Sequence, residues 1–329
     1  MVTLDDVRAA AVRIRGVAVR TPLLEAGPLA LKCENLQPMG AFKVRGACNM
    51  IAQLPPEARA AGVITYSSGN HGQAVALVAQ RFGIRAVVVM PETAPPVKVD
   101  GVRRYGAEVI FEGTTTLHRK ARAEDEAARR RLTMVPPFDD PWVIAGQGTV
   151  GLEILEQRPN VTQVFVPAGG GGLLSGVSVA IKGMRSGVRI VGVEPEGAAK
   201  MSRSRDAGHP VTLERVSSIA DGLLAVRPGD LTFEHVQTLV DDVMTVTDEQ
   251  ITAAVRWLFS EASLVAEPSG AAAVAGALAR GSAPGTSVAI ISGGNVDPNA
   301  YAAYITDAGS ASLNAVSGGT RPTATRERR

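Results

Sequence analysis

The stretch Val161–Met184, "VTQVFVPAGGGGLLSGVSVAIKGM", decides the fold class of this chain. A short apolar run ends at Pro167, four glycines follow, and an amphipathic pattern with helical spacing begins at Leu173. This order predicts a buried strand, a glycine-rich turn and a helix, which together form the repeating unit of a parallel α/β sheet.

The four glycines Gly169–Gly172 also predict a phosphate site. They let successive backbone N–H groups turn toward a ligand, next to the positive end of the helix dipole. A flexible linker is the alternative, but a linker would not lie between a buried strand and an amphipathic helix. The pattern fits neither the GxGxxG dinucleotide turn nor the P-loop.

Other segments repeat a short apolar run that ends in Gly, Ser or Pro, mostly before a helical pattern. They are residues 62–83, 84–106, 107–113, 188–197, 241–262 and 285–295. In residues 241–262, Thr247 is expected to cap the helix. The alternation predicts an α/β fold class, with two doubly wound parallel-sheet domains facing each other across a cleft.

The predicted strands fall into two groups, residues 60–112 and 163–292, separated by the Pro- and Gly-rich segment 135–148. We expect a large domain of residues 1–52 and 142–310, a small domain of residues 53–141, and a disordered basic tail of residues 311–329. Ligands of such sheets bind at the carboxyl ends of strands, where the glycine-rich turns lie.

The composition is that of a soluble globular protein with a sizeable core, since 45% of the 329 residues are hydrophobic and 20% are charged. The net charge is +2, but the last twenty residues carry +3 of it. These charges come from Arg321, Arg326, Arg328 and Arg329 against Glu327. The folded part is left with about −1, which argues against a nucleic-acid-binding face.

Cysteine and histidine usage excludes two further classes. Cys33 and Cys48 form no CxxC pattern, and the four histidines lie far apart in the sequence, so neither a disulfide scaffold nor a zinc finger is expected. The N-terminus lacks an apolar signal core, and no apolar run approaches the roughly 18–20 residues of a membrane span. We expect a cytoplasmic protein without a membrane partner.

Two more strand ends carry polar residues suited to binding. The turn Ser67–Gly72, "SSGNHG", frees backbone N–H groups for an anion such as a carboxylate, although a helix N-cap cluster would explain it equally well. The turn Ser292–Asn295, "SGGN", places a hydroxyl where it can meet a heteroaromatic nitrogen, a weak signal on its own.

The segment Gly40–Ala47, "GAFKVRGA", places Lys43 between apolar residues at a predicted helix start. Burial, the helix N-terminus and the charge of Arg45 would all favour the neutral, nucleophilic amine. A lysine that extends into solvent is the alternative. Together with the phosphate site, the carboxylate loop and the hydroxyl for a ring nitrogen, Lys43 indicates pyridoxal phosphate as cofactor and an amino acid as substrate.

In content and order, these motifs resemble the threonine dehydratase and serine racemase family, which has the tryptophan synthase β-like fold. The resemblance covers residues 4–305 and rests on five motifs. They are "KCENLQPMGAFKVRGA", "SSGNHGQA", "VIAGQGT", "AGGGGLLSG" and "ISGGN". It implies that the cofactor lies in the cleft between the two domains.

The resemblance implies a role for each matching residue. Lys43 would form the Schiff base and remove the α-proton, with Phe42 against one face of the pyridine ring and Gly222 over the other. Asn70 would hydrogen-bond the ring hydroxyl, and Ser292 would face the ring nitrogen. The phosphate would be held by Gly169, Gly170, Gly171, Gly172 and the N–H of Leu173. The substrate-binding loop would consist of Ser67, Ser68, Gly69, Asn70 and His71.

The implied reaction is α,β-elimination of a β-hydroxy amino acid of the L-threonine or L-serine type to a 2-keto acid and ammonia. Ser68 stands where racemases of this family place a second acid/base, so amino-acid racemisation is an alternative. Asp221 matches a racemase-like position near the substrate, or caps a turn. Phe138, expected near the substrate side chain, suits threonine or a bulkier aryl substrate such as phenylserine, and no cluster of extra cations is evident for a second carboxylate.

One motif departs from the family pattern. The resemblance implies a divalent-cation site at Glu194 and Ala198, but the third position is Lys200. We expect the Lys200 ammonium to take the metal's place and pair with Glu194, so that no divalent metal binds. In the alternative, Lys200 points to solvent and a metal binds through waters.

Three rival functions are weighed against this reading. The glycine pattern of a nicotinamide-dependent oxidoreductase is absent from this sequence. A β-replacement lyase of the same fold matches fewer of the motifs. A non-catalytic binding module would not need Lys43. The resemblance further implies a homodimer. The folded part is expected to end near residue 305, without a regulatory domain.

Overall fold

The computed structural model describes residues 1–67, 69–94, 96–281 and 287–306. These residues form two sheets. The larger has the order β1 (Leu23–Ala26), β2 (Leu29–Cys33), β10 (Ser287–Ile291), β7 (Gln163–Pro167), β8 (Arg189–Pro195) and β9 (Asp242–Val246). The smaller has the order β5 (Glu108–Phe111), β4 (Ala86–Met90), β3 (Val63–Tyr66) and β6 (Thr133–Met134).

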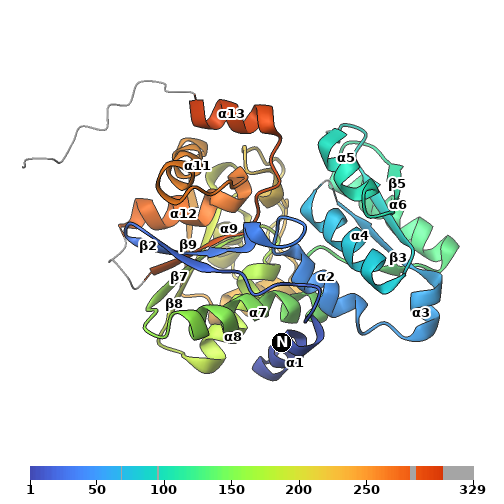
Figure 1. Ribbon diagram of the computed structural model, residues 1–329, viewed down its shortest axis with the longest axis horizontal. Coiled ribbons are helices and arrows are strands. Elements are labelled where there is room, and N and C mark those ends of the chain that lie inside the picture. Colours follow the sequence, from blue (N-terminus) through green and yellow to red (C-terminus); the bar gives the residue numbers. More distant parts are fainter. Residues whose placement is uncertain (68, 95, 282–286, 307–329) are drawn as a thin grey trace, which may run out of the picture.

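Helices cover both sheets, which stand side by side (Figure 1). The smaller sheet carries α3 (Pro56–Ala61), α4 (Asn70–Phe82), α5 (Pro96–Arg103) and α6 (Thr116–Arg130). The rest of the chain contributes α1 (Leu4–Arg13), α2 (Lys43–Ile51), α7 (Pro141–Gln157), α8 (Gly172–Met184), α9 (Lys200–Ala207), α10 (Asp230–Leu239), α11 (Asp248–Ala262), α12 (Pro268–Arg280) and α13 (Pro298–Thr306), with short 3-10 helices η1 (Glu34–Leu36), η2 (Glu196–Ala198) and η3 (Asp221–Leu223). None of the described helices is both long and apolar enough to cross a membrane.

The α/β fold class is confirmed, with one difference from an all-parallel sheet. Neighbouring strands run parallel except β1 and β2, which pair antiparallel as a hairpin. Only Gly27 and Pro28 connect these two strands, and two residues are too few for the crossover that a parallel pair needs. The predicted division into domains at residues 52/53 and 141/142 stays a prediction.

The opening stretch folds as its pattern predicts, with β7 followed by the glycines and α8. On β7, Phe165 belongs to the core under α11 and α12, whereas Val164 and Val166 belong to the core shared with α8. Because β7 lies between β10 and β8 and is buried on both faces from Val164 to Pro167, its sequence is continuously apolar over these residues. The predicted Thr247 cap is confirmed, since its side chain accepts from the N–H of Gln250.

The Pro- and Gly-rich segment 135–148, which separates the two groups of strands, is partly helical. Helix α7 begins inside it at Pro141, and Asp140 caps the helix by accepting from two backbone N–H groups. Gly146 and Gly148 lie within α7 because neighbouring helices come close. A Cβ on Gly146 would lie 2.6 Å from the Arg45 carbonyl oxygen, and one on Gly148 would lie 2.8 Å from the Gly176 carbonyl oxygen.

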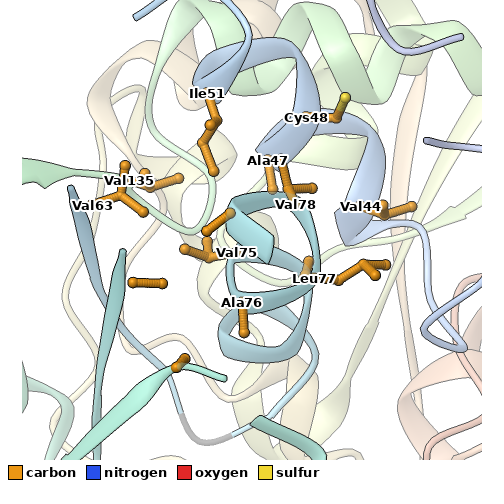
Figure 2. Packing of buried hydrophobic residues seen from close by; sticks show 14 of the residues in the cluster. Val44, Ala47, Cys48, Ile51, Val63, Val75, Ala76, Leu77, Val78 and Val135 are labelled. Carbon is orange, nitrogen blue, oxygen red and sulfur yellow. The ribbon is translucent and has the colours of Figure 1, made fainter. Parts of the chain in front are cut away.

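Helix α2 is packed against the smaller sheet's helix α4. Figure 2 shows Val44, Ala47 and Ile51 of α2 among the side chains of α4, including Val75 and Val78. The first residue of α2 is Lys43, so this apolar contact places the lysine where the two sheets meet.

Candidate active site

Three chain segments that are distant in sequence meet at the carboxyl ends of the strands. The Phe42 N–H donates to the Ser292 carbonyl oxygen at 3.1 Å, and Ala41 and Gly293 form an isolated antiparallel bridge. The start of α2 is thereby tied to the end of β10. The Ser292 side chain is buried, and its Oγ lies 3.4 Å from the Ser269 carbonyl oxygen.

Lys43 is partly buried, and its Nζ donates to the Pro137 carbonyl oxygen at 2.5 Å. The amine also lies 5.2 Å from the centre of the Phe42 ring. Removal from water disfavours the charged form and lowers the pKa of Lys43 to about 8. A substantial fraction of the amine is therefore neutral near physiological pH, as a nucleophile requires.

Arg45 does not supply the repulsion that the sequence suggested. Its guanidinium is buried and donates to both oxygens of Glu34 at 2.7 and 2.8 Å and to both oxygens of Glu153 at 2.7 and 2.9 Å. Glu153 also binds the buried Lys32 at 2.5 Å. Two cations and two carboxylates thus form a closed group of opposite charges, and burial is what lowers the pKa of Lys43.

The glycine loop presents unused hydrogen-bond donors. In the described part of the chain, the backbone N–H groups of Gly169 to Leu173 donate to no protein acceptor. Gly171 has φ +103°, and a Cβ there would lie 2.8 Å from Thr232. Thr232 in turn donates to the Gly170 carbonyl oxygen at 2.7 Å and holds the loop from behind. A row of free N–H groups at a helix N-terminus fits a phosphate.

The turn after β3 contains a buried neutral histidine. His71 Nε2 lies 2.9 Å from the Val135 carbonyl oxygen, whereas its Nδ1 is buried without a partner among the described residues. Burial, and secondarily the charge of Lys43, lower the pKa of His71 to about 3. The Gly69 N–H donates to Ser67 Oγ at 3.2 Å. Ser68, the predicted second acid/base, lies outside the described residues.

Sequence reasoning missed Glu267, which precedes α12 and is 4% exposed. The Asn70 amide donates to Glu267 Oε1 at 2.5 Å, and its oxygen accepts from Asn295 at 2.8 Å. Both ends of the Asn70 amide are therefore fixed. Gly293 is required beside this pair because a Cβ there would lie 2.2 Å from Glu267 Oε1.

Burial, and secondarily the charge of Asp221, raise the pKa of Glu267 from 4.5 to about 8. Between these two values Glu267 is protonated in the folded protein and ionised in the unfolded one. The folded state then binds more protons, so the contribution of Glu267 to the free energy of unfolding falls as pH rises from 4.5 to about 8.

We expect Glu267→Gln, which cannot ionise, to flatten this loss of stability between pH 5 and 8. Urea unfolding at several pH values measures the slope. The exposed Glu261→Gln is the matched control and should leave the slope as in the parent protein. Equal slopes for the parent and Glu267→Gln would show that Glu267 ionises normally in the fold.

Of the remaining predicted residues, Gly222 and Phe138 border the glycine loop. A Cβ on Gly169 would lie 3.3 Å from the Gly222 carbonyl oxygen, so Gly222 borders the loop. The structure places Phe138 against the loop as well, because a Cβ on Gly170 would lie 2.3 Å from its ring. Asp221 forms an ion pair with Lys98 of α5.

The predicted Lys200 arrangement is present. Lys200 and Glu194 are both fully buried, and Lys200 Nζ donates to Glu194 at 3.1 Å. The same ammonium donates to the carbonyl oxygens of Ala168 at 2.6 Å and Ala198 at 3.1 Å. The other oxygen of Glu194 accepts from Ser202. No group of three or more His, Cys, Asp or Glu side chains suited to a metal occurs in the described residues.

Comparison with known proteins agrees with this geometry. The family described as "Pyridoxal-phosphate dependent enzyme" matches residues 14–293. An L-threonine ammonia-lyase of Thermotoga maritima is 46% identical over 308 residues, covering 91% of this chain and 77% of the relative. The biosynthetic L-threonine dehydratase of Escherichia coli is 46% identical over 248 residues, covering 75% of this chain. The chain spans about half the length of that enzyme, since the match covers 48% of it.

Solved structures show the same relationship. Maize serine racemase superposes with a TM-score of 0.87 at 38% identity, covering 91% of this chain and 95% of the racemase. A threonine deaminase from Solanum lycopersicum also superposes with a TM-score of 0.87 at 38% identity, covering 92% of this chain and 86% of the deaminase.

Proposed function

Since the chain belongs to the family of pyridoxal-phosphate-dependent enzymes, we propose that it eliminates water from a β-hydroxy amino acid of the L-threonine or L-serine type. The unsaturated amine that results takes up water again and releases ammonia, which leaves a 2-keto acid. The names of its similar relatives, L-threonine ammonia-lyase and L-threonine dehydratase, support this reaction. The observation that carries it is a lysine with its pKa lowered to about 8, in a site whose glycine loop offers free N–H donors.

The residues present fit pyridoxal phosphate. The free N–H groups of Gly169 to Leu173 would hold the phosphate, Ser292 would meet the ring nitrogen, and Asn70 would meet the ring hydroxyl. When bound, the cofactor withdraws electrons from the substrate's α-carbon and so makes the α-proton acidic. Because a serine does not force protonation of the ring nitrogen, this withdrawal is limited, which favours elimination over transamination.

The protein's own groups would then handle the substrate. Lys43 supplies the amine that links to the cofactor and afterwards takes the α-proton, which its lowered pKa allows near neutral pH. The turn that contains Ser67, Gly69 and His71 would hold the carboxylate. Neutral His71 donates its one ring proton from Nε2 to the Val135 carbonyl oxygen, so its Nδ1 is left as a hydrogen-bond acceptor.

The protein would work without a divalent metal, because Lys200 already supplies a positive charge to Glu194 and two carbonyl oxygens. One of these oxygens belongs to Ala168, directly before the glycine loop. A tethered ammonium in this position would hold the loop as a bound cation would.

A panel of L- and D-β-hydroxy amino acids tests the proposed reaction. We expect keto acid and ammonia in equal amounts from L-threonine or L-serine, with phenylserine included to test the bulkier substrate class. Racemisation is the second candidate, which the similarity to maize serine racemase supports, and chiral analysis of the remaining substrate detects it. If the pure holoenzyme forms no keto acid from any member of the panel, the proposed elimination is wrong.

The homodimer that the resemblance implies stays a prediction, as does the cytoplasmic location expected from the N-terminus and the apolar runs. Light scattering of the purified protein measures the oligomeric state directly.

A further inference from the structure

Lys98 is a cation beside the predicted carboxylate-binding turn. It is not among the site residues inferred from the sequence. It lies on α5, next to the smaller sheet, and its Nζ lies 3.9 Å from where a Cβ on Gly69 would be. The turn and the ammonium therefore face the same space. The sequence showed no cluster of extra cations, but folding brings this single lysine to the site.

The partner of Lys98 comes from the opposite side of the site. Lys98 Nζ forms an ion pair with Oδ2 of Asp221, on η3 between the larger sheet's elements. The Lys98 side chain is 18% exposed and that of Asp221 is 49% exposed. Because Asp221 is half in water, releasing its carboxylate to solvent costs little, and an incoming carboxylate can take its place.

The other titratable groups around this space are mostly uncharged, so they do not oppose the exchange of one carboxylate for another. His71 is neutral, since burial lowers its pKa to about 3. Glu267 is mostly protonated at neutral pH, since its pKa is raised to about 8. Ser269 Oγ lies 3.5 Å from the second oxygen of Asp221 and also accepts from the Gly222 N–H at 2.8 Å. Asp221 thus keeps a polar neighbour when Lys98 leaves it.

We propose that Lys98 binds the substrate's α-carboxylate together with the described part of the turn, Ser67 and Gly69–His71, and that Asp221 is its counter-ion when no substrate is present. This inference rests on the proposed function, which makes an amino acid the ligand. The ammonium exchanges one carboxylate for another, so its charge stays paired throughout. The proposal predicts opposite effects for the two members of the ion pair.

Propionate tests the proposal because it carries a carboxylate but neither amine nor hydroxyl. Its dissociation constant from the full-length holoenzyme is measured by NMR line broadening, which needs no turnover. We expect Lys98→Gln to weaken binding about tenfold or more, as loss of a charge-assisted hydrogen bond implies. We expect Asp221→Asn to strengthen binding severalfold, because propionate no longer competes with the internal carboxylate.

Lys120→Gln is the matched control, since Lys120 is an exposed lysine of α6 paired with Glu124, and it should bind propionate like the parent protein. In turnover, Lys98→Gln should raise KM more than it lowers kcat. Unchanged propionate binding in Lys98→Gln overturns the proposal. Equal weakening in both variants also overturns it, because the ion pair would then only hold the two sides together.

The proposed reaction and the role of Lys98 can fail separately. Absence of keto acid in the amino-acid panel, with the opposite propionate effects intact, rejects the elimination and leaves Lys98 as a carboxylate-binding residue. Normal elimination with unchanged propionate binding in Lys98→Gln supports the proposed reaction and rejects the role of Lys98.

Discussion

Lys43→Ala is expected to lower the turnover of L-threonine or L-serine at least about 1,000-fold, because the variant lacks the amine that links to the cofactor and moves the α-proton. Among the described residues, neither His71 nor Arg45 can replace the amine. His71 is neutral and directs one ring nitrogen at the Val135 carbonyl oxygen, and Arg45 is enclosed by Glu34 and Glu153. Keto acid release under saturating substrate measures the loss.

The same variant should still bind pyridoxal phosphate, because the N–H donors of Gly169 to Leu173 do not involve Lys43. Borohydride reduction followed by mass spectrometry should therefore attach the cofactor to the parent chain and not to Lys43→Ala. The control Lys182→Ala removes a lysine of α8 that pairs with Asp241, remote from the glycine loop, and should react as the parent does. Attachment of the cofactor to Lys43→Ala, or activity within tenfold of the parent, would contradict the assignment.

Lys200→Ala is expected to lower the free energy of unfolding by about 3–5 kcal/mol, because it leaves the buried Glu194 carboxylate without its cation. The carbonyl oxygens of Ala168 and Ala198 lose their donor as well. Since Ala168 precedes the glycine loop, affinity for the cofactor should fall together with stability. Urea unfolding and cofactor titration, both in the presence of a chelator, measure the two effects.

Added Mg²⁺ should restore part of the stability of Lys200→Ala, because a carboxylate and two carbonyl oxygens around the vacated space are ligands that this ion accepts. Lys200→Met is the matched control. The methionine side chain fills the space without a charge, so Mg²⁺ should not restore the stability of this variant. The parent protein should keep its activity in a strong chelator. Loss of parent activity that Mg²⁺ restores would show that a metal acts despite Lys200.

Local patterns predicted the strands and helices because these elements depend mainly on residues that are close together in the chain. Continuous apolar residues before Gly169 indicate a strand buried on both faces, and the helical spacing after Gly172 indicates α8. The composition of segment 135–148 marked it only as the separation between two groups of strands and did not reveal that α7 begins inside it. Gly146 and Gly148 are there because α2 and α8 approach α7 closely, which only the packed structure reveals.

The residues of the candidate site also divide into those with a local sequence signal and those without one. Lys43, the four glycines and Ser292 could be proposed from the sequence because each lies in a short motif whose chemistry is local. Glu267 was not, because a single acid before a proline resembles any helix cap, and its partner Asn70 lies 197 residues away in the chain. The distant partners Glu153 of Arg45 and Asp221 of Lys98 were hidden for the same reason.

The sequence by itself therefore determined the strand–glycine–helix units, because backbone conformation follows from adjacent residues. From residue chemistry it also predicted a phosphate loop, a Schiff-base lysine and a cation in place of a metal. Only the tertiary structure decided which charges are neutralised and which face the ligand. Burial raises the pKa of Glu267 and lowers the pKa of Lys43, and proximity across the site pairs Lys98 with Asp221. Burial and proximity depend on how the two sheets come together, which no short stretch of the chain records.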